Sequence, residues 1–338
     1  MARQNISVLL AERPTADVIP GKTFRIETGP APTAADLKEG FLLIESLYLS
    51  VDPAMRGWLD DRPSYLPPVQ IGDVMRGITA GRVLASNGWT EVTIMHETMV
   101  ENPLPGLPAT LRSRLGPIDL VSSLGFTSLT AYFGLLRVAD GIRPTDTVVV
   151  SGAAGATGSV VGQLAKIMGA KRVVGIAGSV EKVEWLVKEL GFDAGINYKD
   201  ADFAQQFEAA VPDGIDVYWD NVGGDILNMA LGHANLHARF VMCGGISQYN
   251  SAEPKGPKNI FQVVARRIKL QGFLVLDYAS EHAAAIAELA RWKAEGKLKS
   301  SEHVVKGGLR VAEQAFVDLF KGMNTGKLLV EIKNPDDA

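Results

Sequence analysis

Short apolar runs alternate with stretches of helical spacing through the second half of the chain. Six runs rich in β-branched residues predict strands at Thr147–Ser151, Arg172–Ala177, Gly195–Tyr198, Ile215–Asp220, Arg239–Gly244 and Leu270–Val275. Between them, helical spacing runs over Gly158–Met168, Glu181–Leu190 and Gly224–Ala234. Strands and helices that alternate in this order favour a parallel, doubly wound sheet.

The pattern is different in the first third of the chain, where proline and glycine separate shorter apolar runs. These runs lie at Phe41–Leu49, Gly81–Ala85 and Thr93–Val100. Such spacing predicts an irregular, mainly antiparallel β domain.

The tail of the chain breaks the alternation. A long helix is expected at Glu281–Glu295, followed by a strand at Glu302–Val305, a helix at Val311–Met323 and a strand at Lys327–Ile332. We expect this tail to return to the first domain. The predicted fold class is therefore α/β, with a mainly β domain over residues 1–122 and 300–338 and a doubly wound domain over 123–299.

Charge and cysteine content limit the classes of protein to which this chain can belong. The 34 basic and 38 acidic residues are well mixed along the chain, which argues against nucleic acid as a partner. Cys243 is the one cysteine, so no intramolecular disulfide can form, as is typical of the cytoplasm. The uncharged stretch Thr147–Ala165 nearly has the length of a membrane span, but its glycines favour a strand, a turn and a helix start instead.

A glycine-rich turn, Ser151–Gly158, joins the first predicted strand of the doubly wound domain to a helix. In that setting, glycine lets the backbone approach a pyrophosphate, and the N–H groups of the helix start receive its charge. The spacing is Gly-x-x-Gly-x-x-Gly, with Ala154 where a second glycine commonly stands. The turn predicts dinucleotide binding; the alternative is a plain tight turn.

The next strand favours NADPH over NADH. NAD-binding folds usually place a carboxylate at the tip of this strand, where it bonds the ribose. Here the strand runs into Gly178 and Ser179, with Lys182 about one helical turn further on. A 2′-phosphate would be accepted by these groups, unless Lys182 is simply a solvated helix residue.

The chain lacks the residue patterns of several other oxidoreductases. One cysteine and five histidines without ligand spacing predict no metal site. No tyrosine is followed by lysine four positions later, as short-chain reductases require. The sequence therefore favours a metal-free reductase.

Four stretches together resemble a known family. They are Leu49–Arg56, Gly125–Tyr132, the turn Ser151–Gly158, and Asp220–Gly224 followed by Cys243–Asn250. With them the chain resembles the zinc-independent medium-chain dehydrogenase/reductases, in the leukotriene hydroxydehydrogenase/prostaglandin reductase branch that includes alkenal double-bond reductases. The resemblance implies a GroES-like catalytic domain, a Rossmann NADP-binding domain and a homodimer joined through a sheet edge.

The resemblance also implies the cofactor-binding residues, with Lys182 and Tyr198 at the 2′-phosphate. They are Gly152, Ala154, Gly155, Ala156, Thr157, Gly178, Ser179, Lys182, Tyr198, Asn221, Cys243, Ser247, Tyr249, Phe273, Val275, Asn324 and Gly326.

The implied reaction is reduction of the carbon–carbon double bond of α,β-unsaturated aldehydes or ketones, with hydride from NADPH added at the β-carbon. The candidate proton donor is Tyr249, which could equally pack against the cofactor or substrate. Candidate substrate-pocket residues are Tyr48, Met55, Arg56 and Tyr65. For Arg56, a structural salt bridge is the alternative. Two other functions stay open: an NADPH quinone reductase on the same fold, and a non-catalytic NADPH-binding protein.

Overall fold

The computed structural model describes residues 3–81, 84–85, 88–101 and 106–334, which fold into two compact units. Unit 1 comprises the described residues of Met1–Val121, Glu302–Asn324 and Leu328–Ala338; unit 2 comprises Ser122–Ser301 and Thr325–Lys327. Within the described ranges, no helix is both long and apolar enough to cross a membrane.

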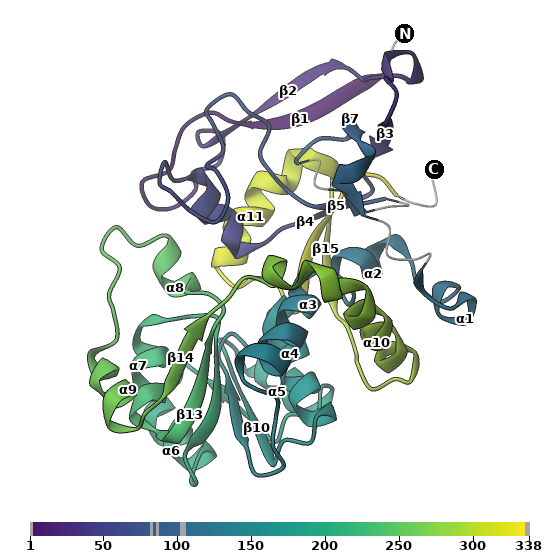
Figure 1. The fold of residues 1–338 in the computed structure, drawn as a ribbon. Coiled ribbons are helices and arrows are strands. Elements are labelled where there is room, and N and C mark those ends of the chain that lie inside the picture. The colour runs from purple at the N-terminus through teal and green to yellow at the C-terminus, as the bar shows by residue number, and fades with distance from the viewer. Residues whose placement is uncertain (1–2, 82–83, 86–87, 102–105, 335–338) are drawn as a thin grey trace. The chain divides into compact units, whose positions relative to one another are not determined.

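Unit 2 is built on a six-stranded sheet with the order β11-β10-β9-β12-β13-β14 (Figure 1). Its strands are β9 (Thr147–Val150), β10 (Arg172–Ala177), β11 (Ala194–Asn197), β12 (Ile215–Asp220), β13 (Ala234–Met242) and β14 (Lys269–Gly272). All neighbouring pairs are parallel. Counted within the unit, this order is three-two-one-four-five-six, as in dinucleotide-binding folds. The predicted parallel, doubly wound sheet is confirmed.

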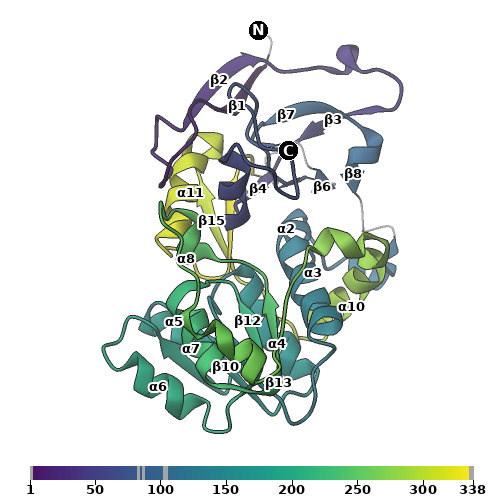
Figure 2. The same cartoon turned by 60° about the vertical axis from the view of Figure 1, so that its left-hand side comes forward.

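Helices cover both faces of this sheet. The helices of unit 2 are α3 (Phe126–Phe133), α4 (Ala156–Ile167), α5 (Val180–Lys188), α6 (Phe203–Ala210), α7 (Gly224–Gly232), α8 (Ile246–Tyr249), α9 (Gln262–Ala265) and α10 (His282–Ala294), of which the short α8 lies in the loop after β13. On one face, Val149 and Tyr218 share a core with Phe207 of α6 and Leu227 of α7. On the other face, α4 packs against β9, β10 and α3, and α10 lies beside α3 (Figures 1 and 2).

Three details of unit 2 differ from the sequence predictions. Strand β13 begins at Ala234, five residues before the predicted start at Arg239, because Ala234 already pairs with Ile215 of β12 and a bulge, in which His237 adopts a φ of 62°, lies between the two pairs. Strand β14 ends at Gly272 rather than at Val275. Helix α6 was not among the predicted helices.

Unit 1 is mainly antiparallel, with sheets β1-β2, β3-β7 and β15-β16-β4-β5-β6-β8. Its strands are β1 (Gln4–Leu10), β2 (Phe24–Pro30), β3 (Phe41–Glu45), β4 (Tyr48–Ser50), β5 (Thr79–Ala80), β6 (Leu84–Ala85), β7 (Val92–His96), β8 (Val100–Glu101), β15 (Glu302–Lys306) and β16 (Lys327–Glu331). Its helices are α1 (Ala109–Arg112), α2 (Pro117–Val121) and α11 (Ala312–Phe320). Strand β16 pairs with β4, and Phe316 of α11 shares a core with Trp89.

Two predicted strands of unit 1 are each divided. The run Phe41–Leu49 forms two strands, because β3 pairs with β7 in one sheet and β4 pairs with β5 in another. The chain changes sheets at the buried Ser46, whose hydroxyl donates to the Thr90 carbonyl at 2.9 Å. A 3-10 turn, Glu97–Met99, separates β7 from β8. Of the run Gly81–Ala85, residues 82–83 lie outside the described residues.

Candidate cofactor and active site

The glycine-rich turn runs from the carboxyl end of β9 into α4. Gly152 adopts a φ of 58°, and a Cβ built on Gly158 would lie 2.4 Å from the Gly152 carbonyl oxygen. The N-cap residue of α4 is Gly155, and no side chain of the described residues caps this helix. The first N–H groups of α4, at Ala156 and Thr157, therefore have no side-chain acceptor among the described residues. Free N–H groups at a helix start can bind a phosphate group.

A short segment of the tail is built into the same turn. The Gly326 N–H donates to the Ala154 carbonyl at 2.8 Å, and Gly155 forms a parallel bridge with Gly326. A side chain is excluded at Gly326, because its φ is 73° and a Cβ there would lie 2.1 Å from the Ser301 carbonyl oxygen. The structure thus brings Gly326 to the turn. Asn324, the other tail residue predicted to bind the cofactor, is buried in unit 1.

The predicted 2′-phosphate residues come together beyond β10. Ser179 is the N-cap of α5, and its Oγ accepts the Lys182 N–H at 3.3 Å. The Tyr198 ring lies against Gly178, where a Cβ would come within 2.9 Å of it. The Lys199 ammonium lies 5.8 Å from the centroid of the Tyr198 ring.

Two lysines, Lys182 and Lys199, make the predicted 2′-phosphate site positively charged. Burial lowers the pKa of the half-buried Lys182, and the positive charge of Lys199 lowers it further. An anion bound there would relieve that repulsion. Lys199 was missed by the sequence analysis, although it directly follows Tyr198 beyond the end of β11.

The side chain of Asn221 is held at both ends by the protein. Its Oδ1 accepts the Trp219 indole N–H at 3.0 Å, and its Nδ2 donates to the Ser151 carbonyl at 2.7 Å. Asn221 therefore fastens the end of β12 to the glycine-rich turn. Its predicted contact with the cofactor stays a prediction.

Cys243 contributes its backbone rather than a reactive thiol. Its N–H donates to the Asp220 carbonyl at 2.9 Å. Burial raises the pKa of the Cys243 thiol to about 12, and the negative charge of Asp220 acts in the same direction. A thiol with that pKa is neutral at physiological pH, so it is no nucleophile.

Tyr249 ends the short helix α8, and its hydroxyl lies against the preceding loop. The Oη accepts the Gly245 N–H at 3.0 Å, and a Cβ on Gly244 would come within 2.9 Å of it. Ser247 holds the same loop, because its Oγ donates to the Val222 carbonyl at 2.6 Å. Both predicted residues therefore lie in a loop that is bonded to the end of β12.

Phe273 and Val275 follow the carboxyl end of β14. The Phe273 ring lies edge-on to Trp219, with centroids 6.0 Å apart. Both rings close over Gly134, where a Cβ would come within 2.3 Å of Trp219. Gly134 begins a π-helical turn, a feature that often marks functional sites.

The four predicted substrate residues lie in unit 1. Arg56 is buried, pairs with Asp60 at 2.7 Å and donates to the Ala16 carbonyl at 3.0 Å. This is the structural salt bridge that the sequence left open. Met55 is fully buried in the core, so we leave Met55 and Arg56 out of the proposed pocket.

The other two substrate candidates are tyrosines. Tyr48 lies in β4 and is buried. The Tyr65 side chain is 45% exposed, and its hydroxyl accepts the Trp58 indole N–H at 2.9 Å. Of the two, the exposed Tyr65 ring offers the larger surface to a ligand.

No group of three or more histidine, cysteine, aspartate or glutamate side chains in the described part of the chain could hold a metal ion. His233 and His237 are four apart, a spacing that would bring them together on one face of a helix, but His233 caps α7 and His237 lies in β13.

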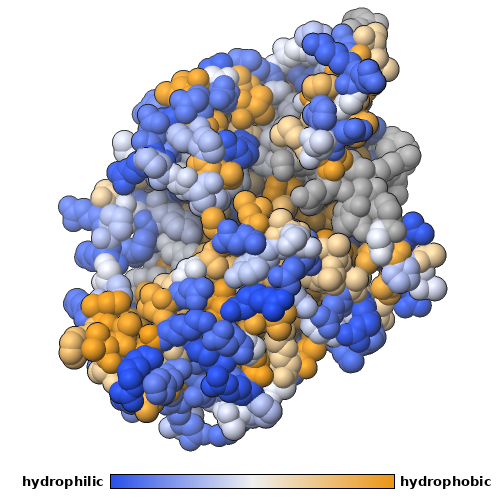
Figure 3. Space-filling model, in the orientation of Figure 1, coloured by the Kyte–Doolittle hydropathy of each residue, from blue (hydrophilic) through white to orange (hydrophobic). Residues whose placement is uncertain are grey.

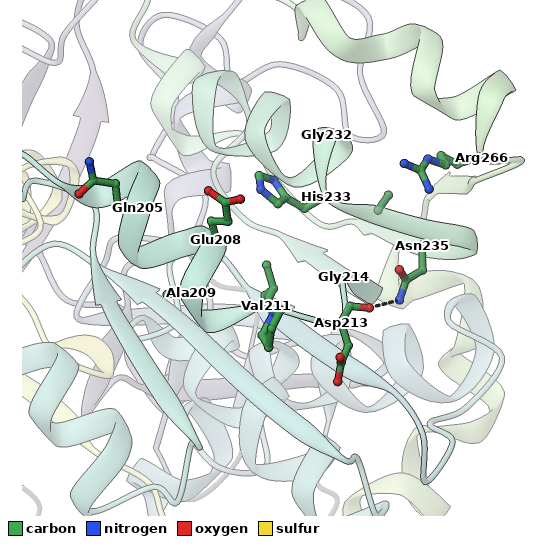
Figure 4. A pocket seen from close by; sticks show the side chains of 12 residues that line it. Gln205, Glu208, Ala209, Val211, Asp213, Gly214, Gly232, His233, Asn235 and Arg266 are labelled. Atoms are coloured by element: carbon green, nitrogen blue, oxygen red, sulfur yellow. Dashed lines mark hydrogen bonds between the residues drawn. The ribbon is translucent and has the colours of Figure 1, made fainter.

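A surface pocket of about 740 Å³ lies elsewhere, at the amino ends of β12 and β13 (Figure 4). Three of its polar side chains are bonded to the protein: Asp213 pairs with Lys171, and Asn235 donates to the Asp213 carbonyl at 2.9 Å. His233 is bonded to the Met229 carbonyl. None of the predicted site residues lines this pocket, so the candidate site remains at the carboxyl ends of the strands.

Comparison with known proteins finds relatives over nearly the whole chain. Two family models match: "N-terminal domain of oxidoreductase" over residues 7–91 and "Zinc-binding dehydrogenase" over residues 156–291. The NADPH-dependent curcumin reductase of Escherichia coli is 37% identical, over 99% of each chain. Prostaglandin reductase 1 of Bos taurus is 39% identical, over 91% of this chain and 93% of that protein. The crystal structure of CurA from Vibrio vulnificus in complex with NADPH has a TM-score of 0.87 at 36% identity, and the match covers 98% of this chain and 100% of that one.

Proposed function

Since the chain belongs to the zinc-independent medium-chain dehydrogenase/reductase family, in the branch of the curcumin and prostaglandin reductases, we propose that it is an NADPH-dependent reductase of the carbon–carbon double bond in α,β-unsaturated aldehydes and ketones. The family and fold class expected from the four sequence stretches are confirmed. In the proposal, residues 1–122 and 300–338 form the catalytic domain and 123–299 bind the cofactor.

The observation that carries the proposal is a pair of anion sites in unit 2. One is the start of α4, where Gly155 is the N-cap and no described side chain caps the helix. The other is the Lys182–Lys199 pair beside Ser179. NADPH has one pyrophosphate and one 2′-phosphate, so its charges match these two places. A Cβ at Gly158 would lie 2.4 Å from the Gly152 carbonyl oxygen, so glycine at 158 lets the turn close tightly against the start of α4, where the pyrophosphate would bind in the proposal.

When bound, NADPH supplies the hydride that reduces the β-carbon of the double bond. Negative charge then develops on the substrate carbonyl oxygen, and a donor must stabilise it. In the proposal that donor is Tyr249. The Gly245 N–H bond to its Oη orients the hydroxyl and stabilises the oxygen once the proton has moved.

NADPH oxidation over a panel of enals, enones and quinones tests this proposal, with NADH as the second cofactor. We expect turnover of enals and enones with NADPH and much slower turnover with NADH. Preferential turnover of quinones would establish the quinone reductase instead. Tight NADPH binding without turnover of any acceptor would indicate a non-catalytic binding protein.

A homodimer joined through the edge strand β14 is part of the proposal. Strand β14 ends the sheet order, and Leu270 on it is exposed. Nearby, hydrophobic side chains gather on the surface where α9 lies (Figure 3). Phe261 and Val264 there are 71% and 66% exposed, and exposed apolar side chains that gather in one patch often mark an interface.

The proposed substrate is a small molecule, and its pocket includes Tyr48 and Tyr65. A cytoplasmic location stays a prediction from the single cysteine.

A further inference from the structure

The carboxyl group of Asp220 ends β12 and exposes none of its surface. Its Oδ1 accepts hydrogen bonds from Ser151 Oγ at 3.0 Å and Tyr218 Oη at 3.2 Å. The same oxygen accepts the N–H groups of Val222 at 3.1 Å and Gly223 at 2.9 Å. Its Oδ2 has no hydrogen-bond partner within the part of the chain that the structure describes.

Ser151 connects Asp220 to the glycine-rich turn, of which it is the first residue. Its Oγ accepts the Asn221 N–H at 3.0 Å, and its carbonyl accepts the Asn221 side-chain amide at 2.7 Å. A Cβ on the next residue, Gly152, would lie 3.3 Å from the Asn221 Cβ. The start of the glycine-rich turn therefore lies directly against the end of β12.

The main chain of Asp220 fixes a third segment. Its carbonyl accepts the N–H groups of Cys243 at 2.9 Å and Gly244 at 3.0 Å. This is the loop that continues to Tyr249. One residue thus joins the glycine-rich turn, the Asn221–Gly224 turn and the loop of the candidate proton donor.

Stability alone is a poor explanation for a carboxylate at this position. A buried charge without a cation is costly, and burial raises the pKa of Asp220 against the opposing effect of its hydrogen bonds. The buried Asp146 of the same unit differs, because Arg239 pairs with it at 2.5 Å. Four donors converge on Oδ1, and a carboxylate holds such donors roughly twice as strongly as a neutral amide oxygen would, so the carboxylate indicates a role in fixing these segments.

We propose that Asp220 is the positioning residue of the cofactor site, a role that rests on the proposed use of NADPH. It holds the glycine-rich turn against the Asn221–Gly224 turn, so that the first N–H groups of α4 face the pyrophosphate. Asp220 itself acts through Ser151 and the turn amides rather than by touching the cofactor.

Binding titrations of the full-length Asp220→Asn variant test this role without relying on activity. Two probes are used: NADPH, which needs the whole site, and adenosine 2′-monophosphate, which needs the Lys182–Lys199 end. We expect the Kd for NADPH to rise roughly tenfold or more, while the Kd for adenosine 2′-monophosphate changes less than twofold. A Kd for NADPH within twofold of the wild type, or an equal loss for both probes, would overturn the inference.

Asp216→Asn is the matched control. Asp216 lies at the other end of β12 and accepts the Thr147 N–H and the Asn235 amide, each at 2.9 Å. This variant should lower the midpoint of thermal unfolding without changing the Kd for NADPH. If it weakens NADPH binding as much as Asp220→Asn does, the role of Asp220 is merely structural.

Ser151→Ala keeps the inference testable if Asp220→Asn does not fold. It removes one donor to Asp220 and the acceptor of the Asn221 N–H, so we expect weaker NADPH binding here as well. Because both residues act through one network, the double variant should lose less than the sum of the two single losses. Failure of the wild type to bind either probe would reject the proposed function instead.

Discussion

In the proposed function, the positive charges of two lysine side chains select NADPH over NADH. The tip of β10 carries no carboxylate, whereas Lys182 and Lys199 lie close enough for the charge of one to lower the pKa of the other. That repulsion is unfavourable until a phosphate neutralises it. The proposed selectivity for NADPH therefore rests on two residues from different segments: Lys182 in the first turn of α5 and Lys199 after the end of β11.

Replacing either lysine should weaken NADPH much more than NADH. We expect Lys182→Ala or Lys199→Ala to raise the KM for NADPH roughly tenfold, with little change in the KM for NADH. Steady-state kinetics with both cofactors measure this. Lys188→Ala is the control, because Lys188 is exposed on the same helix and pairs with Glu184. Equal losses for both cofactors would contradict the assignment.

The hydroxyl of Tyr249 is expected to supply the proton. Tyr249→Phe removes the hydroxyl and keeps the ring, so we predict a fall in kcat of roughly a hundredfold with little change in NADPH binding. Tyr278→Phe provides the comparison, since the Tyr278 ring stacks on Phe133 at 4.9 Å. Unchanged turnover of Tyr249→Phe would show that Tyr249 is not the proton donor and only packs against the cofactor or substrate.

The Cys243 thiol should be inert in the folded protein. With a pKa of about 12, it carries almost no thiolate at pH 8. A disulfide reagent such as dithionitrobenzoate should leave the native protein unmodified and react with one equivalent after unfolding. Cys243 is partly exposed, so rapid stoichiometric reaction of the native protein would show that its thiol is ionised and would contradict the raised pKa.

Helix α4 approaches its neighbours closely enough to require glycine at 162. Alanine normally stabilises a helix interior by about 1 kcal/mol relative to glycine. Here a Cβ would lie 1.9 Å from the Phe192 ring, so we expect Gly162→Ala to destabilise unit 2 by roughly 1–3 kcal/mol. Urea unfolding measures the change. Gly57→Ala is the control, since a Cβ at Gly57 would meet no described atom within 4 Å; equal effects would contradict the close packing.

Elements with a strong local pattern were predictable, and those set by distant contacts were not. β10 and β12 have the bounds that the apolar runs predicted. β13 differs, because its bulge at His237 depends on pairing with β12. The division of Phe41–Leu49 depends on Thr90, far along the chain.

The candidate site shows the same distinction. The turn Ser151–Gly158 was evident from its glycines and its place after a strand. Lys199 was not noted in the sequence, and Asp220 was noted only as part of the stretch Asp220–Gly224, because the roles of both arise only in the folded chain. The family resemblance suggested Arg56 as a pocket residue, yet its guanidinium is bonded to Asp60 and to the Ala16 carbonyl within unit 1.

At the scale of the whole molecule, the exposed apolar surface around α9 predicts self-association. Val264→Asp places a charge in the proposed interface, so the variant should elute as a monomer while the wild type elutes as a dimer. Size-exclusion chromatography with light scattering measures the mass directly. The exposed Ile71 of unit 1 offers the control substitution, Ile71→Asp, which should leave the dimer intact. A monomeric wild type would reject the homodimer.

The fate of the hydride tests the central claim most directly. NADPH deuterated at the transferred position of the nicotinamide is incubated with the protein and an enone, and the product is analysed by NMR. We predict a saturated ketone that carries deuterium on the β-carbon. An allylic alcohol with deuterium on the former carbonyl carbon, or a product without deuterium, would contradict the account.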